Sequence, residues 1–357
     1  MRILYISTRI DGSGGLQRSL SVRLNYLAKM GYEIYLLTTN SENRALYFPL
    51  DKKINYIERQ DVSRFFDYRK LIQSTYKEVN PDLVIVSDNG LKGFLIPYFI
   101  SNKTKIIYEL HVTKEQLVTD NNKFFGTLGI SKILITKSSK KFSAFVVLSK
   151  KEAEKWNLKN LSIIPNPITL PNSKLSSLEN KKAIFVGRLK LVKGVDFLVQ
   201  VWEKVNQKYP DWTLEVYGEK FPEFDMEKAI YDKGLNHSAF VFKPVYDIQN
   251  KYSQASIFLM TSRIEPFGLV LTEAMSCGLP CVSFDAPEGP SSIIEHNQNG
   301  FLISCFDVES FSKKVIELIE NVNLRKQIGV SAKKSSLKYN QEKIMEQWIM
   351  LYEKVIK

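Results

Sequence analysis

The sequence is poor in the residues that build disulfide-stapled or metal-centred proteins. Its 357 residues include only three cysteines and three histidines. Cys277, Cys281 and Cys305 are an odd number in a long chain, so a disulfide framework is not indicated. No histidine or further cysteine stands near Cys277 and Cys281 at the spacing of a zinc site. We therefore expect three reduced, mostly buried thiols in a cytoplasmic protein.

Long hydrophobic runs are also lacking. The longest run, residues 94–100, is far below the ~18 residues that a membrane-spanning helix needs. Residues 1–7 have the pattern of a strand, not of a charged segment followed by a longer apolar stretch, so we expect no secretory signal. The sequence predicts a cytoplasmic protein that does not cross a membrane, and it leaves open a peripheral position at the inner face of the cell membrane.

The charge is unbalanced, with 50 basic against 38 acidic residues and a net charge of +12. Nucleic acid, an anionic membrane surface and phosphorylated small molecules are the partners that such a charge suits, and a lysine-rich solvated surface is the alternative. No helix concentrates arginine with interleaved aromatic residues in the manner of a nucleic-acid reader. We therefore expect no nucleic-acid partner.

Short apolar runs alternate with helix-length amphipathic segments along the whole chain. We predict strands at residues 3–7, 33–38, 83–87, 105–109 and 144–148, and again at 183–187, 213–217, 239–242, 257–260 and 280–284. Strands this apolar are typical of parallel sheets covered by helices on both faces. The fold class is thus α/β, with two Rossmann-like doubly wound domains in tandem.

The alternation breaks at residues 162–168, and a polar segment rich in proline and serine follows to about residue 182, where we place the linker. The predicted domains are residues 1–165, residues 166–338 and a final helix, 339–357. Ligands of such sheets bind at the carboxyl ends of the strands, which makes the cleft between two facing domains the expected site.

Two loops carry groups that suit phosphate. Residues 11–16 follow the first strand and contain Gly14 and Gly15, which let backbone N–H groups approach an anion at a helix start. The alternative is a plain tight turn, because the loop matches neither GxGxxG nor a Walker A motif. After the first strand of the second domain, Arg188 and Lys193 form a cationic pair suited to a diphosphate. The alternative is two exposed basic residues among many.

A third segment, residues 261–273, places two carboxylates around an apolar stretch. Glu265 precedes Pro266, which favours a helix start just after it, and Glu273 then lies on the helix. Carboxylates accept hydrogen bonds from sugar hydroxyls, and the N–H groups of Phe267, Gly268 and Leu269 are helix-start donors. The alternative is a helix-start charge at Glu265 and a solvated Glu273.

Together these segments resemble the retaining glycosyltransferases of family 4, which have the GT-B fold. The resemblance covers nearly the whole chain and includes residues 299–302 and the segment 164–167 as the hinge. It implies that the final helix crosses back to the first domain. Residues 287–294 resemble the version found in bacterial capsule and exopolysaccharide transferases, some of which use UDP-galactose or UDP-N-acetylgalactosamine.

The resemblance implies a role for each candidate residue. Arg188 and Lys193 would hold the donor diphosphate as catalytic cations, and the backbone at Gly14 and Gly15 would touch the distal phosphate. Glu273 would accept hydrogen bonds from the ribose. The groups that contact the transferred sugar would be Glu265, the backbone amides of Phe267, Gly268 and Leu269, and His111. A structural histidine is the alternative for His111.

The implied enzyme is a hexosyltransferase that needs no metal or other cofactor. It would move a hexose or N-acetylhexosamine, of the galactose or N-acetylgalactosamine type, from a UDP-sugar to a glycan of the bacterial surface. The leaving diphosphate, stabilised by cations and amides, would help to take the acceptor's proton. The alternatives are another GT-B enzyme, such as an epimerase or phosphorylase, and a non-catalytic protein that binds nucleic acid or a nucleotide sugar.

Residues 124–141 mix apolar residues with four lysines, a pattern of helices that lie on anionic bilayers. The segment falls in the domain that takes the acceptor in this fold. We therefore expect a lipid-linked glycan acceptor at the cytoplasmic leaflet, with an ordinary surface helix as the alternative.

Overall fold

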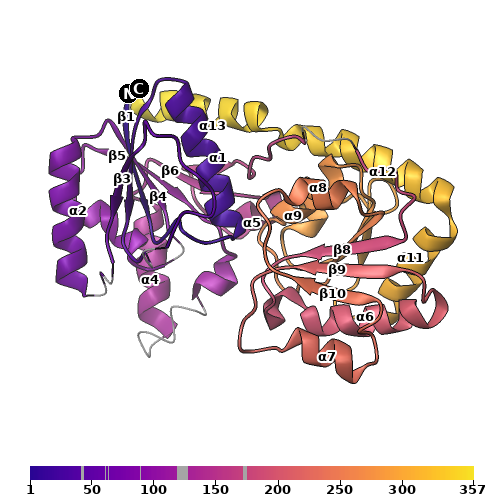
Figure 1. Cartoon of the computed structure of the whole chain (residues 1–357). Helices are drawn as coiled ribbons and strands as arrows, with labels where there is room; N and C mark the ends of the chain where they lie inside the picture. Colours follow the sequence, from indigo (N-terminus) through magenta and orange to yellow (C-terminus); the bar gives the residue numbers. More distant parts are fainter. Residues whose placement is uncertain (42–43, 61, 63, 89, 119–127, 172–174) are drawn as a thin grey trace. The chain divides into compact units, whose positions relative to one another are not determined.

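The computed structural model describes residues 1–41, 44–60, 62, 64–88, 90–118, 128–171 and 175–357. The chain divides into two compact units, each of which is described by itself. The first unit comprises Met1–Pro167 together with Gln341–Lys357, and the second is Ile168–Asn340. The last helix, yellow in Figure 1, thus belongs to the same unit as the first strand.

The first unit is built on a seven-stranded parallel sheet with the strand order β3-β2-β1-β4-β5-β6-β7. Its strands are β1 (Arg2–Ser7), β2 (Glu33–Thr38), β3 (Asn55–Glu58), β4 (Leu83–Ser87), β5 (Lys105–Glu109), β6 (Ala144–Val147) and β7 (Leu161–Ile163). The five strands predicted here are confirmed. The two that were missed, β3 and β7, are the edge strands, whose half-exposed residues lack a continuous apolar run.

Helices cover both faces of this sheet. They are α1 (Gly15–Lys29), α2 (Phe65–Val79), the 3-10 helix η1 (Gly93–Tyr98), α4 (Leu128–Ser139), α5 (Lys150–Glu154) and α13 (Gln341–Ile356). Because successive strand residues point to opposite faces, Tyr5 packs with α1 and α13, whereas Leu4 and Ile6 pack with α2 and η1. The final helix is therefore part of the first unit's core, through Trp348 and Tyr352 among others.

The second unit repeats the plan with six parallel strands in the order β10-β9-β8-β11-β12-β13. The strands are β8 (Lys182–Val186), β9 (Thr213–Tyr217), β10 (Ala239–Phe242), β11 (Ile257–Met260), β12 (Cys281–Phe284) and β13 (Phe301–Ile303). The helices are η2 (Leu191–Lys193), α6 (Val195–Lys208), α7 (Met226–Asp232), α8 (Ile248–Ser253), α9 (Leu269–Ser276), α10 (Pro290–Ile293), α11 (Val308–Glu320), α12 (Val322–Ser336) and η3 (Leu337–Tyr339). Trp202 and Phe311 are buried at the centre of its core.

Two parallel-sheet α/β domains confirm the predicted fold class. The units divide between Pro167 and Ile168, at the start of the predicted linker, but its predicted extension to about residue 182 is wrong. Ser176 donates its backbone N–H to the carbonyl of Cys277 at 3.1 Å, and Leu178 is buried against the second unit. Residues 175–182 therefore belong to the second unit and are not a free connection. Cys277 and Cys281 are buried free thiols and Cys305 is half-buried, as expected.

Each sheet has one place where the strand order reverses. In the first unit it lies between β1 and β4, and in the second between β8 and β11. Loops leaving two such strands diverge to opposite faces, which opens a crevice at their carboxyl ends where ligands of this fold class bind. The fold thus brings the loops that follow β1, β4, β8 and β11 to the functional edge of their respective sheets.

Candidate functional site

In the second unit, the loops after β8 and β11 are tied together. Arg263 donates its backbone N–H to the carbonyl of Val192 at 2.9 Å, and the Thr261 hydroxyl donates to the carbonyl of Gly194 at 2.8 Å. Gly194 has a positive φ of 66°, and a Cβ there would lie 1.7 Å from the Thr261 carbonyl oxygen. Only glycine fits this close approach, so the two loops are held as one rigid edge.

This edge joins two of the predicted site residues directly. The Nζ of Lys193 lies 2.6 Å from Oε2 of Glu265, and the Ser262 hydroxyl donates to the same oxygen at 3.3 Å. Glu265 is therefore not a mere helix-start charge, because α9 begins four residues later at Leu269. Arg188 is exposed on the same loop as Lys193. The sequence predicted a pair of cations, Arg188 and Lys193. Its spacing did not predict that Lys193 would pair with the carboxylate of Glu265.

Glu273 lies within α9 and is only 3% exposed, which excludes a solvated residue. The Tyr252 hydroxyl lies 3.5 Å from its Oε2. The Phe267 ring is buried and stands edge-on to Tyr339, with centroids 5.5 Å apart, so its side chain belongs to the core and only its backbone can serve a ligand. Gly268 takes the left-handed conformation (φ 93°) that starts α9.

Several helices, including three that begin near these edges, have no side-chain cap. Among the helices that the structure describes, α1, α6 and α9 begin at the N-cap residues Gly14, Gly194 and Gly268 without a side-chain cap, as do α2 and α10. Side chains cap five other helices, namely α5 by Ser149, α7 by Asp225, α8 by Asp247, α11 by Asp307 and α12 by Asn321. Helix N–H groups that no own side chain caps, together with the helix dipole, favour an anion or a sugar oxygen.

In the first unit, Gly14 and Gly15 stand at the start of α1, at the end of the loop that follows β1. Gly15 is exposed, so the first N–H groups of this 15-residue helix are open to a ligand. Across the switch point, the Thr8 hydroxyl donates to Asp88 Oδ1 at 2.6 Å, which joins the loops after β1 and β4. The predicted phosphate loop is thus at the functional edge of its sheet, and its role stays a prediction.

His111 lies two residues beyond the end of β5 and takes part in a buried charged network. Its Nε2 is 3.0 Å from Oε2 of Glu109 and 3.2 Å from the Ser87 hydroxyl at the end of β4. Both oxygens of Glu109 accept from the guanidinium of Arg23, each at 2.6 Å. Arg23, Glu109 and His111 have at most 5% of their side chains exposed.

The network fixes the charge of Glu109. Burial alone would raise the pKa of this carboxyl, but the Arg23 charge and the hydrogen bonds from His111 and Arg23 outweigh it and lower the pKa to about 2. On the other side of the guanidinium, the Trp348 ring of α13 lies 4.7 Å from Arg23 Cζ, a cation–π contact. Glu109 is therefore an ionised carboxylate held between a cation and a histidine.

Sequence reasoning missed Glu109 and Arg23, although both left a signal. Arg23 interrupts the apolar face of α1 among Leu20, Leu24 and Leu27, where an unpaired charge would be costly. Glu109 and His111 are two residues apart in extended chain, which places both side chains on one face. A buried arginine thus required a carboxylate partner, and the strand end supplied it.

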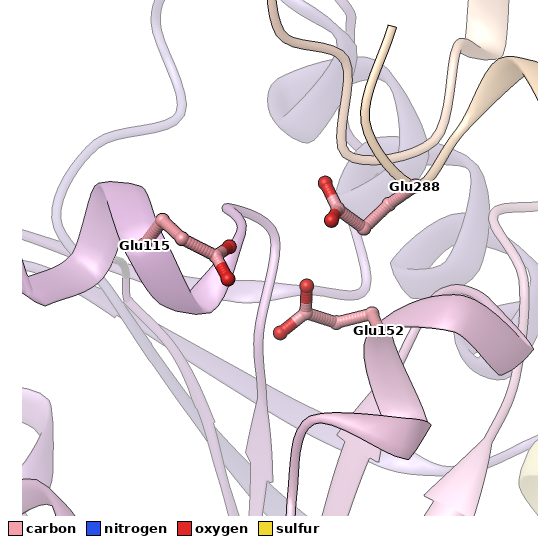
Figure 2. A group of neighbouring side chains, drawn as sticks. All are labelled: Glu115, Glu152 and Glu288. Carbon is pink, nitrogen blue, oxygen red and sulfur yellow. The ribbon is translucent and has the colours of Figure 1, made fainter. Parts of the chain in front are cut away.

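Figure 2 shows three carboxylates, of which Glu115 and Glu152 belong to the first unit and Glu288 to the second. Within the first unit, Glu152 Oε1 accepts from the Trp156 indole at 2.7 Å and from the Lys114 backbone N–H at 3.1 Å. Glu115 pairs with Lys155 at 2.7 Å. These contacts explain the two carboxylates as structural groups of their own unit.

The predicted site residues are divided between the two units. Arg188, Lys193, Glu265 and the start of α9 share the β8/β11 edge, whereas Gly14, Gly15 and His111 belong to the first unit. Of the predicted membrane segment, residues 124–127 lie outside the described residues, and the rest is α4 with the turn that follows. Within the described part of the chain, no helix has the length and apolar character that spanning a bilayer requires.

The fold is that of a protein class with two Rossmann-like parallel-sheet domains. Residues 168–335 match the family model of glycosyl transferases group 1. A protein of Haemophilus influenzae described as an uncharacterized glycosyltransferase is 30% identical, over 97% of this chain and 98% of its own length. The chain belongs to the glycosyltransferase group 1 family.

Two further likenesses agree with this assignment. The amylovoran biosynthesis glycosyltransferase AmsD of Erwinia amylovora is 26% identical over 97% of this chain and 98% of that protein. The structure of Staphylococcus aureus TarM, solved with UDP, superimposes with a TM-score of 0.79 at 17% identity, covering 99% of this chain and 100% of that chain. The expected GT-B fold is thereby confirmed.

Proposed function

We propose that this glycosyltransferase is a retaining hexosyltransferase that transfers a hexose or N-acetylhexosamine from a UDP-sugar to a glycan acceptor in bacterial surface polysaccharide synthesis. The observation that carries the proposal is the Lys193–Glu265 ion pair at the β8/β11 switch point, where a cation and a carboxylate meet at the edge at which ligands of this fold class bind. The names of AmsD, an amylovoran biosynthesis enzyme, and of TarM, solved with UDP, support the glycan and the nucleotide.

Each residue would have a separate task. Lys193 and Arg188 would neutralise the charge that grows on the diphosphate as the glycosidic bond breaks, without a metal ion. Glu265, with the N–H groups at the start of α9, would hold the hydroxyls of the transferred sugar. Glu273 would accept from the ribose hydroxyls. The leaving phosphate would then take the acceptor's proton on the same face of the sugar, which retains the anomeric configuration.

A thermal-shift panel tests the donor site. UDP, GDP, ADP, UDP-glucose, UDP-galactose and the UDP-N-acetylhexosamines are compared, with NAD as a control. A ligand at 100 times its dissociation constant stabilises the folded protein by about 2.7 kcal/mol, a clear rise in melting temperature. We expect the uridine series to shift the wild type, the galactose-type donors most, and to shift Glu273→Gln much less. Glu317→Gln, on the exposed side of α11, is the matched control and should respond as the wild type does.

If no nucleoside diphosphate raises the melting temperature, the donor assignment is wrong. If the sugar is transferred, the anomeric configuration of the product, read by NMR coupling constants, decides between retention and inversion. A strict need for inorganic phosphate would instead identify a phosphorylase, and release of a free sugar or a new nucleotide sugar would identify an epimerase.

We further propose that the acceptor is lipid-linked and that the first unit meets it at an anionic membrane surface. Phe65 and Phe66 are exposed at the start of α2, 46% and 77% respectively, and Ile133 of α4 is 55% exposed. The exposed Tyr98 of η1 carries Lys141 over its ring at 4.8 Å. Exposed aromatic rings next to lysines suit the interface of an anionic bilayer.

Flotation with vesicles tests this acceptor proposal. The wild type should float with phosphatidylglycerol-containing vesicles and stay in solution with phosphatidylcholine alone. Phe66→Ser should weaken the binding without loss of melting temperature, because the ring is exposed. Tyr231→Ser, on an equally exposed aromatic residue of the second unit, is the matched control. Equal flotation with both lipids, or none with either, would overturn the proposal.

A further inference from the structure

The buried network of the first unit determines which nitrogen of His111 carries hydrogen. Glu109 is the last residue of β5, and the ladder continues one residue further, because Leu110 donates its N–H to the Val146 carbonyl at 2.9 Å. The extended backbone therefore places Glu109 and His111 on the same face. Their side chains meet there with 3.0 Å between Oε2 and Nε2.

In each hydrogen bond that Glu109 makes through its side chain, the partner has to supply the hydrogen. The carboxylate is ionised, because burial is outweighed by Arg23 and His111 and its pKa lies at about 2. An ionised carboxylate only accepts hydrogen bonds. The Ser87 hydroxyl uses its single hydrogen toward Glu109 at 3.2 Å, so it can meet the ring nitrogen only as an acceptor. Both neighbours of Nε2 are thus acceptors, and Nε2 must donate.

We infer that Glu109 is the positioning residue for His111, holding the ring in the tautomer that carries hydrogen on Nε2. In the neutral ring this tautomer leaves Nδ1 without hydrogen, as an acceptor. The inference rests on the proposed function for the part that His111 plays at the sugar.

The carboxylate itself is held from a second side. Arg23 clamps both of its oxygens at 2.6 Å, and the Trp348 ring covers the guanidinium. Next to them, the hydroxyls of Tyr5 and Tyr352 are hydrogen-bonded at 2.9 Å within the same core. An arginine fork has fixed planar geometry, so the clamp leaves Glu109 little freedom to turn away from the ring. The carboxylate orients the histidine as outer-shell carboxylates orient metal-binding histidines.

NMR of the protein labelled with 15N-histidine reads the tautomer directly. The chain has only three histidines, His111, His237 and His296, so the spectrum is simple and His111→Gln assigns the signal. Long-range 1H–15N correlation is recorded at about pH 8.5, about two units above the ordinary histidine pKa. The wild type should show hydrogen on Nε2 of His111. Hydrogen on Nδ1 in the folded wild type would overturn the inference, and this measurement needs no folded variant.

Variants separate positioning from general support of the fold. In Glu109→Gln the amide can turn an N–H toward the ring, so we expect the Nε2–H form of His111 to lose its dominance. Turnover should fall about tenfold or more, as for other outer-shell partners, while UDP still binds. Tyr352→Phe removes a hydrogen bond from the same core without touching Glu109 or His111, and should keep the wild-type tautomer. An unchanged tautomer in folded Glu109→Gln contradicts the inference.

Failure of this inference and failure of the proposed function look different. UDP binding is measured at residues of the second unit and does not depend on the tautomer of His111. If His111 carries its hydrogen on Nδ1 while sugar transfer is intact, Glu109 is not the positioning residue, but the proposed function stands. The expected tautomer without any UDP binding removes the proposed function and leaves the arrangement of Glu109 and His111 intact.

Discussion

The two units each hold an ion pair near the end of their central strands, but in different surroundings. In the first unit, Arg23 and Glu109 each have 1% of the side chain exposed, whereas Lys193 and Glu265 in the second keep 19% and 10%. The first pair is clamped by two hydrogen bonds and an aromatic ring, and the second by one contact and a serine. We therefore expect the first pair to stay closed and the second to exchange partners with a ligand.

The largest effect is expected where the buried pair is broken. Glu109→Ala leaves the Arg23 charge buried without its carboxylate, and breaking such a pair costs about 3–5 kcal/mol of unfolding free energy. Hydrogen exchange resolved by mass spectrometry should show the loss in β1, β5 and α13 and not in the second unit. In the double variant Arg23→Met with Glu109→Met, much of the loss should return. Full stability in Glu109→Ala would mean that the pair is not a closed structural clamp.

The next effect is the response of the same pair to acid. The pKa of Glu109 is lowered to about 2 in the folded protein, from 4.5. A lowered carboxyl pKa contributes stability above the unfolded value, and that contribution is lost as the pH falls through the folded value. Between about pH 5 and pH 2 we therefore expect the first unit to lose about 3 kcal/mol from this group. Chemical unfolding at a series of pH values checks it, and Glu109→Met combined with Arg23→Met should flatten the slope.

The less buried pair, Lys193 and Glu265, should affect binding more than stability. Lys193→Met removes a cation from the proposed diphosphate site, and we expect UDP to bind about tenfold to a hundredfold more weakly, a loss of about 1.4–2.7 kcal/mol. Calorimetric titration with UDP measures this. Lys204→Met is the matched control, because Lys204 also pairs with a glutamate in this unit but lies on α6 with 45% of its side chain exposed. If Lys193→Met and Lys204→Met bound UDP with equal affinity, the proposed role of Lys193 at the diphosphate would be contradicted.

The smallest effect on stability is expected for a third ion pair, which is more exposed than the other two. Arg263 and Asp196 form a two-point ion pair at 2.6 and 2.7 Å on the same edge of the second unit, with 29% and 23% of the side chains exposed. Partly solvated pairs contribute little, so Asp196→Asn should cost below about 1 kcal/mol and less at high salt. Urea unfolding at two salt concentrations tests it. A loss comparable to that of Glu109→Ala would show that exposure does not separate the two kinds of pair.

Much of the fold was readable because central parallel strands are apolar along their whole length. Residues 83–86 and 257–260 are such apolar runs, and the structure places them in strands as predicted. The edge strand β3 carries the half-exposed residues of Asn55–Glu58 and gave no such signal. The candidate site followed the same rule, since Lys193 and Glu265 lie in the loops that follow two central strands, whose ends must share one edge of the sheet.

The amino-acid sequence by itself determined the two-domain α/β architecture, the loops at the functional edges and the family, because apolar period and loop chemistry are local properties of the chain. Only the tertiary structure decided that Lys193 pairs with Glu265, that residues 175–182 pack on the second unit, and that Arg23 and Trp348 surround Glu109. Residues 23, 109 and 348 are far apart along the chain. Which buried charge meets which partner depends on how helices cross a sheet, and no local pattern contains that information.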